Sequence, residues 1–169
     1  NHRPYSYPAN KIDIPSGTGR PGAVKYTDFA LRSFLQKAKS KPWFKNTIFV
    51  VVADHCASTA GKNEIDVANY HIPAFIFNVP EAVPQKVGKQ CSQIDLMPTV
   101  LGLMHWDYES NLFGQDIFNK DYEEKALIAT YRKLALMKGD NVVILSDQKK
   151  QAAYTWQKQG NILNPAPMD

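Results

Sequence analysis

The ten residues at 47–56 constrain the fold of this chain more than any other stretch. They read Thr-Ile-Phe-Val-Val-Val-Ala-Asp-His-Cys, an uninterrupted apolar and β-branched run that ends at an acid followed by an imidazole. A short continuous apolar run is typical of a strand buried on both faces, as in a parallel sheet. Open α/β sheets carry their chemistry just outside the carboxyl ends of such strands. We therefore expect Asp54 and His55 to lie at a functional edge of an α/β fold.

Asp54 and His55 are candidate metal ligands. A carboxylate beside an imidazole suits a divalent ion such as Zn or Mn. The structural alternative is that Asp54 caps the following turn while His55 packs beside it. The pair alone does not decide between these interpretations, so the choice depends on the surrounding motifs.

The composition fits one domain and excludes several classes of function. The chain has 169 residues and 44% hydrophobic content, enough for a single core. Its formal charge of +4 is spread over scattered lysines, so we expect no nucleic-acid partner. No stretch approaches the ~20 apolar residues of a membrane span. The two cysteines, Cys56 and Cys91, lack the CxxC spacing of zinc or redox motifs; they either pair in an oxidising compartment or stay as free thiols.

The pattern up to residue 104 alternates loops, helices and strands. Residues 1–22 are rich in Pro, Gly and Ser and are predicted to be a loop. Apolar residues recur on one helical face over 23–39, and a second apolar strand is predicted over 72–77. We expect an edge strand near Val87 and a short helix over 94–104.

From residue 126 onward the periodicity changes to that of an antiparallel meander. Turn residues separate four short apolar runs, at 127–131, 134–137, 142–145 and 153–156. Residues 139–141 are predicted to form a hairpin turn, and the tail 161–169 shows no pattern. We therefore predict a main domain over 1–120 and an antiparallel subdomain over 121–169 within the same structural unit.

Four motifs follow one another in a specific order along the chain. They are Asn-His-Arg-Pro-Tyr at 1–5, Ala-Asp-His at 53–55, Tyr-His-Ile-Pro at 70–73 and Gln-Ile-Asp-Leu-Met-Pro-Thr at 93–99. Together they resemble the sulfatase-like branch of the alkaline phosphatase superfamily, and most closely its lipoteichoic-acid-synthase type phosphoglycerol transferases of bacterial envelopes. The Leu-Phe-Gly-Gln-Asp segment at 112–116 is similar to the family's small turn after that helix.

The resemblance implies both a fold and a position within a longer protein. The expected fold is part of the α/β three-layer alkaline-phosphatase/sulfatase type, a mainly parallel sheet with flanking helices, followed by a small C-terminal antiparallel β subdomain. The family's nucleophile, a Thr or a Cys matured to formylglycine, lies in an N-terminal half. Cys56 is not that residue, because it lacks the Cys-x-Pro-x-Arg surroundings. We therefore expect this chain to be inactive without that half, and an exposed sheet edge to favour oligomers.

The resemblance also implies roles for particular residues. Asp54 and His55 would ligate a divalent metal, Mn or Mg as in the transferases, with Ca or Zn as alternatives. His2 would contact the substrate's phosphate or protonate its leaving group, as an imidazole can do near neutral pH. The alternative for His2 is a terminal residue exposed to solvent.

Other polar residues carry weaker expectations. His71 either contacts the substrate or helps to seat the following strand, and Lys62 would face the phosphate from the loop after the pair. His105 is expected to be structural, and Asp95 to be a residue of a helix N-terminus.

The function implied is transfer or hydrolysis of a phosphoglycerol group from an anionic phospholipid or envelope glycan. The enzyme would use a covalent phosphothreonine-type intermediate and a metal ion, in a periplasmic or extracytoplasmic domain of an inner-membrane protein. One alternative is a sulfatase or phosphodiesterase that acts on soluble esters. Another is a non-catalytic module that binds the cell envelope.

Overall fold

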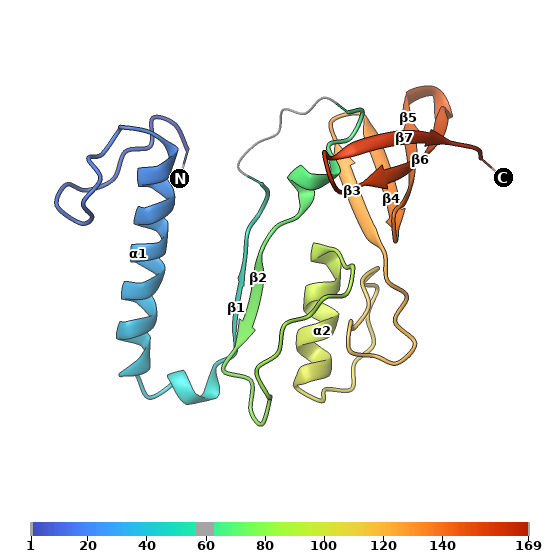
Figure 1. Ribbon diagram of the computed structural model, residues 1–169. Coiled ribbons are helices and arrows are strands. Elements are labelled where there is room, and N and C mark those ends of the chain that lie inside the picture. The colour runs from blue at the N-terminus through green and yellow to red at the C-terminus, as the bar shows by residue number, and fades with distance from the viewer. Residues whose placement is uncertain (1, 57–62, 169) are drawn as a thin grey trace. The chain divides into compact units, whose positions relative to one another are not determined.

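The computed structural model describes residues 2–56 and 63–168, and the chain divides into two compact units after Thr47 (Figure 1). The first unit is a loop folded against the start of helix α1 (Arg20–Lys39). Tyr7 anchors that loop: its ring stacks on Tyr26 with centroids 5.0 Å apart, and its hydroxyl donates to the carbonyl of Ile14. A Cβ at position 22 would collide with that hydroxyl, so the contact requires Gly22. The predicted helix is confirmed and begins three residues earlier.

The second unit contains strands β1 to β7 and helix α2 (Leu96–Leu103). Its described residues form a two-stranded sheet of β1 (Phe49–Val52) and β2 (Ala74–Phe77), and a five-stranded sheet. The five strands are β3 (Ala126–Thr130), β4 (Lys133–Lys138), β5 (Asn141–Ser146), β6 (Gln151–Gln157) and β7 (Ile162–Ala166). No helix among the described residues is long and apolar enough to cross a membrane.

The pairing of β1 differs from the prediction. The strand is present, but it pairs with β2 in antiparallel register, from Phe49 opposite Phe77 to Val52 opposite Ala74. Its faces alternate in burial, and Val50 remains 41% exposed, so it is not buried on both faces. Facing side chains stabilise this register: the rings of Phe49 and Phe77 stack with their centroids 4.9 Å apart.

The five-stranded sheet confirms the predicted meander, with each strand next to its neighbour in sequence. Lys138 pairs with Asn141 across a two-residue turn in which Gly139 has φ 58°, a conformation that glycine adopts readily. The prediction of a patternless tail is wrong, because β7 pairs along β6. Pro165 is tolerated there since β7 is an edge strand. The strand expected near Val87 is absent from the described residues.

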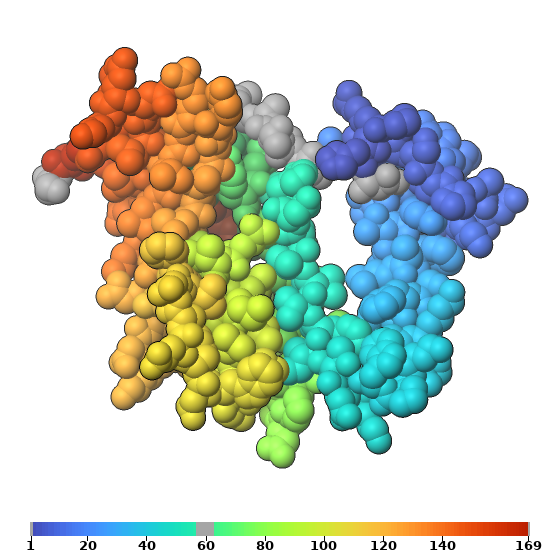
Figure 2. Space-filling view, turned by 180° about the vertical axis from the view of Figure 1, so that it is seen from behind, coloured from blue at the N-terminus to red at the C-terminus, as the bar shows by residue number. Residues whose placement is uncertain are grey.

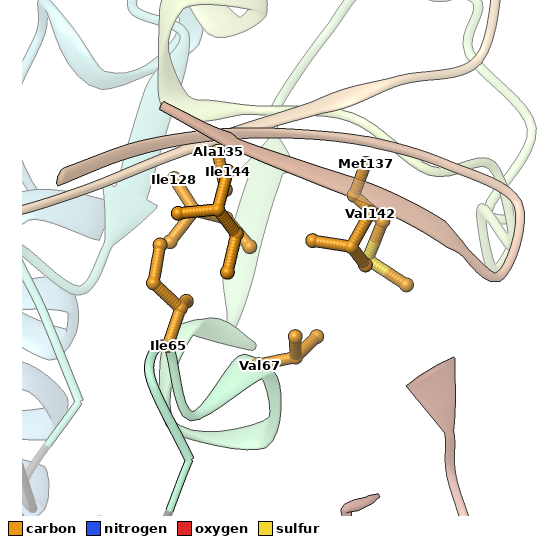
Figure 3. Close-up of a cluster of buried hydrophobic side chains, with 7 residues drawn as sticks. All are labelled: Ile65, Val67, Ile128, Ala135, Met137, Val142 and Ile144. Carbon is orange, nitrogen blue, oxygen red and sulfur yellow. The ribbon is translucent and has the colours of Figure 1, made fainter. Parts of the chain in front are cut away.

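One face of this sheet carries a cluster of buried hydrophobic side chains. Ile65 and Val67, from the loop before β2, point toward the side chains of the strands (Figure 3). The strand residues of the cluster are Ile128, Ala135, Met137, Val142 and Ile144. The opposite face leaves apolar side chains exposed, including Leu134 at 57%. The C-terminal sheet and the loop before β2 therefore share one core, and the proposed boundary between 1–120 and 121–169 stays a prediction.

Candidate functional site

Asp54 and His55 lie directly after β1, at its carboxyl end, as predicted. The Asp54 Oδ1 atom accepts the backbone N–H of His55 at 2.9 Å, and His55 Nε2 lies 3.4 Å from Asp54 Oδ2. The other ring nitrogen, His55 Nδ1, is 2.7 Å from the carbonyl oxygen of Cys56. A carbonyl oxygen only accepts hydrogen bonds, so Nδ1 carries the proton, and in the neutral ring Nε2 carries the lone pair.

This arrangement suits a cation between the two side chains. In the neutral tautomer the lone pair of His55 Nε2 and a carboxylate oxygen of Asp54 approach one another, and a proton or a metal ion resolves their repulsion. Two neighbouring ligands of one ion lie roughly 3.4 Å apart around a tetrahedral ion and roughly 3.0 Å apart around an octahedral ion such as Mg or Mn. The observed 3.4 Å matches the first value and is a few tenths of an ångström wider than the second. Metal-binding histidines commonly donate their other ring N–H to a backbone carbonyl. The donor atoms present therefore fit two ligands of one metal ion.

The pair is open to solvent and is not a complete metal site. The Asp54 side chain is 83% exposed and that of His55 57%. Over residues 2–56 and 63–168, no group of three or more His, Cys, Asp or Glu side chains could hold a metal ion.

Residues near His71 extend the pairing of β1 and β2 up to the Asp-His pair. The Ala53 backbone N–H donates to the Pro73 carbonyl at 3.2 Å, and the Cys56 thiol donates to the carbonyl of His71 at 3.5 Å. The carbonyl of His71 thus contacts Cys56, beyond the strands, while the His71 side chain is exposed. A role for that side chain in substrate binding stays a prediction. Cys56 and Cys91 are free thiols.

Gln93 contacts the same strand end, and sequence analysis assigned it no role. Its Nε2 atom donates to the carbonyl oxygens of Ala53 at 2.8 Å and of Asp54 at 3.1 Å. Gln93 opens the 3-10 helix Gln93–Asp95 that leads into α2. The one available signal was its place at the head of the fourth motif.

Asp95 holds the start of α2, which confirms its predicted place at a helix N-terminus. It is 3% exposed and forms a capping box with Ser92. Its carboxylate also accepts the Gln115 backbone N–H at 2.8 Å and the Tyr122 hydroxyl at 3.3 Å. Burial, followed by the charge of Asp95, raises the pKa of Tyr122. The buried carboxylate is fully occupied by structural contacts.

The motif at 112–116 closes over this helix start. A Cβ at Gly114 would collide with the carbonyl of Ile94, so this approach requires a residue without a side chain. The segment after α2, yellow in Figure 2, lies beside the orange part of the chain that follows it, and Lys125 Nζ, just before β3, donates to Gln115 Oε1 at 3.2 Å. The third and fourth predicted motifs and this turn thus surround the end of β1 and the start of α2.

Asn161 ties the loop before β2 to the turn between β6 and β7. Its carbonyl accepts the Asn63 side-chain amide at 2.6 Å, and its own Nδ2 donates to Asp66. Its Oδ1 accepts the Ala68 backbone N–H at 3.2 Å and the indole N–H of Trp156 at 2.9 Å. A single turn residue therefore anchors four groups.

Glu64 adds a charged anchor in the same loop. Its carboxylate accepts from Lys133 Nζ and from the Tyr154 hydroxyl, each at 2.9 Å. The hydrogen bond from Lys133, and then that from Tyr154, lowers the pKa of Glu64, while the bond to Glu64 raises the pKa of Tyr154. The loop therefore meets the five-stranded sheet through both ionic and apolar contacts.

The predicted roles of His2 and Lys62, like that of the His71 side chain, stay predictions. His2 is exposed in the first unit, where its carbonyl accepts the Tyr5 backbone N–H at 2.8 Å. Lys62 lies outside the described residues. His105, expected to be structural, has φ 54° and closes α2: its N–H donates to Gly102 and that of Trp106 to Leu101. These two bonds form a Schellman motif.

Comparison with known proteins places the chain in a family. The family model described as Sulfatase matches residues 7–106, more than half of the chain. This chain belongs to the sulfatase family. A solved protein of the alkaline phosphatase superfamily from Vibrio parahaemolyticus superposes with a TM-score of 0.89 and 33% sequence identity. That match covers 100% of this chain and 42% of the other, so the predicted α/β fold class is confirmed.

Two curated relatives of this sulfatase-family chain are larger proteins. Lipoteichoic acid synthase-like YvgJ of Bacillus subtilis (strain 168) is 27% identical over 161 residues, covering 83% of this chain and 24% of that protein. Phosphoglycerol transferase I of Salmonella arizonae is 27% identical over 150 residues, covering 83% of this chain and 18% of that protein. The chain thus spans a quarter or less of these relatives. The matched family segment includes Asp54, His55 and Gln93 but not His2.

Proposed function

We propose that this chain is part of a metal-dependent transferase or hydrolase that acts on phosphoglycerol groups of envelope lipids or glycans. The observation that carries the proposal is the facing pair of donor atoms, His55 Nε2 and Asp54 Oδ2, at the end of β1. The names of the relatives, lipoteichoic acid synthase-like protein and phosphoglycerol transferase, support this substrate class. An anionic phospholipid is the donor we favour, in a periplasmic or extracytoplasmic location.

Asp54 and His55 would hold the ion, Mn or Mg by preference. The carboxylate supplies negative charge, and the Nδ1 hydrogen bond to the Cys56 carbonyl keeps the lone pair of His55 on Nε2. When bound, the metal would supply Lewis acidity toward a phosphoryl oxygen and a template for the ester. The high exposure of both side chains leaves room for a bulky substrate head group.

His2 is proposed as a substrate ligand or general acid, and His71 and Lys62 as substrate contacts. Turnover is proposed to need residues outside this chain, among them the nucleophile and further metal ligands. The two-residue donor set supports this, as does the 24% share of the first relative that the chain spans.

A sulfatase or phosphodiesterase acting on soluble esters is the second candidate. The family match itself favours it, because the matched model is that of the sulfatases. The two candidates differ in the leaving group and not in the use of Asp54 and His55.

The test is turnover by the protein that contains this chain, with phosphatidylglycerol vesicles compared with a soluble sulfate ester and a soluble phosphodiester. We expect release of diacylglycerol from the vesicles, and a loss of kcat/KM of about 100-fold or more in Asp54→Asn, because a metal ion contributes several kcal/mol to transition-state stabilisation. Asp107→Asn, which changes an exposed acid in the loop after α2, should retain the activity. Turnover of soluble esters alone would favour the second candidate. Full activity of Asp54→Asn would contradict both.

A further inference from the structure

We propose that Gln93 is a positioning residue that fixes the direction in which Asp54 and His55 point, an inference that rests on the proposed function of that pair. The Gln93 amide nitrogen donates to two consecutive carbonyl oxygens, those of Ala53 and Asp54, at 2.8 and 3.1 Å. These carbonyls belong to the two peptide planes that flank the Asp54 Cα atom. Holding both planes fixes the backbone dihedrals of Asp54, and with them the direction of its Cα–Cβ bond.

The position of these bonds explains why the site needs them. The last paired residues of the small sheet are Val52 and Ala74, and the Ala53 N–H makes one further bond to Pro73. Asp54 therefore lies beyond the strand ladder. His55 depends in turn on Asp54, because its backbone N–H is held by Asp54 Oδ1. The side-chain amide of Gln93 thus holds the backbone at the point where the hydrogen bonds of the sheet end.

Gln93 is itself held by a rigid support. It begins the 3-10 helix that contains buried Asp95, whose carboxylate binds the backbone of Ser92 on one side and of Gln115 on the other. Gly114 lies against the carbonyl of the intervening Ile94. This support allows an exposed glutamine to hold a fixed position despite competition from water.

The chain offers a matched control three residues away. Gln90 makes the same kind of side-chain contacts with backbone: its Nε2 donates to the Gly139 carbonyl at 3.1 Å, and its Oε1 accepts the Gly139 N–H at 3.0 Å. These bonds hold the turn between β4 and β5. Replacing Gln90 by alanine therefore removes the same kind of hydrogen bonds, but at a place away from the end of β1.

The experiment compares Gln93→Ala, Gln93→Glu and Gln90→Ala in the protein that contains this chain. Hydrogen exchange of the metal-free protein reports the order of Ala53 and His55 directly, and Mn²⁺ titration reports the consequence. We expect both Gln93 variants to speed exchange at 53–55 about five- to tenfold, since a net hydrogen bond contributes roughly a factor of that size. Mn²⁺ affinity should fall about 10- to 100-fold, as when groups that orient metal ligands are removed.

Gln93→Glu separates positioning from packing, because it keeps the size of the side chain while its carboxylate cannot donate to the two carbonyls. Gln90→Ala should speed exchange at the β4–β5 turn and leave 53–55 and Mn²⁺ affinity unchanged. Wild-type exchange at 53–55 in both Gln93 variants, or wild-type behaviour of Gln93→Glu, would overturn the inference. If Asp54→Asn leaves Mn²⁺ binding intact, the proposed function fails instead, and the metal-free exchange still decides the role of Gln93.

Discussion

At the scale of the residue, the site depends on backbone carbonyls that side chains recognise. The carbonyl of Cys56 sets the tautomer of His55, and the carbonyls of Ala53 and Asp54 bind Gln93. Such contacts leave no periodicity in the sequence. Asp54 and His55 were predictable because they end an apolar strand, whereas Gln93 was not, because any polar residue at a helix start looks alike before the fold is known.

Gly114 gives a prediction at this scale. Gly114→Ala should lower the free energy of unfolding by about 1–3 kcal/mol, because the new methyl group meets the carbonyl of Ile94, a backbone atom that cannot move aside. Gly88→Ala is the control, since nothing lies within 4 Å of a Cβ there, and it should stay within about 0.5 kcal/mol of wild type. Denaturant unfolding measures both. Equal stability of the two variants would show that close packing of Gly114 against the helix start does not stabilise the fold.

At the scale of the element, strand positions followed from the sequence better than strand partners did. Short apolar runs separated by turn residues predicted β3 to β6, and the glycine turn predicted the hairpin between β4 and β5. The parallel pairing predicted for β1 was wrong, because an apolar run fits either direction, and its partner residues, such as Phe77 opposite Phe49, lie far away in the sequence. β7 was missed because Pro165 suggests a break, yet an edge strand accommodates it.

Ile65 gives the prediction for this scale, because it joins a loop to the sheet. Ile65→Ala should cost about 2–5 kcal/mol of stability, the range for a large side chain buried in a core, since Ile65 is only 2% exposed. Leu134→Ala, on the opposite face at 57% exposure, should cost less than about 1 kcal/mol. Thermal unfolding compares them. A similar cost for both would mean that the loop before β2 does not share the core of the sheet.

At the scale of the whole molecule, the order of the motifs reflects one structural neighbourhood in the second unit. The motif at 53–55 ends β1, that at 70–73 begins β2, and that at 93–99 supports the end of β1 through Gln93. The five-stranded sheet holds the connecting loop through Asn161 and Glu64. The resemblance identified the family from these motifs, and the structure explains why three of them occur together.

Mn²⁺ titration of the protein that contains this chain measures metal binding at Asp54 and His55. Calorimetry of the wild type, Asp54→Asn and the control Asp107→Asn would measure affinity and stoichiometry. We expect one tight site in the wild type and in the control, with an affinity at least about 100-fold weaker in Asp54→Asn through the loss of an anionic ligand. Equal Mn²⁺ affinity and stoichiometry in Asp54→Asn would contradict it.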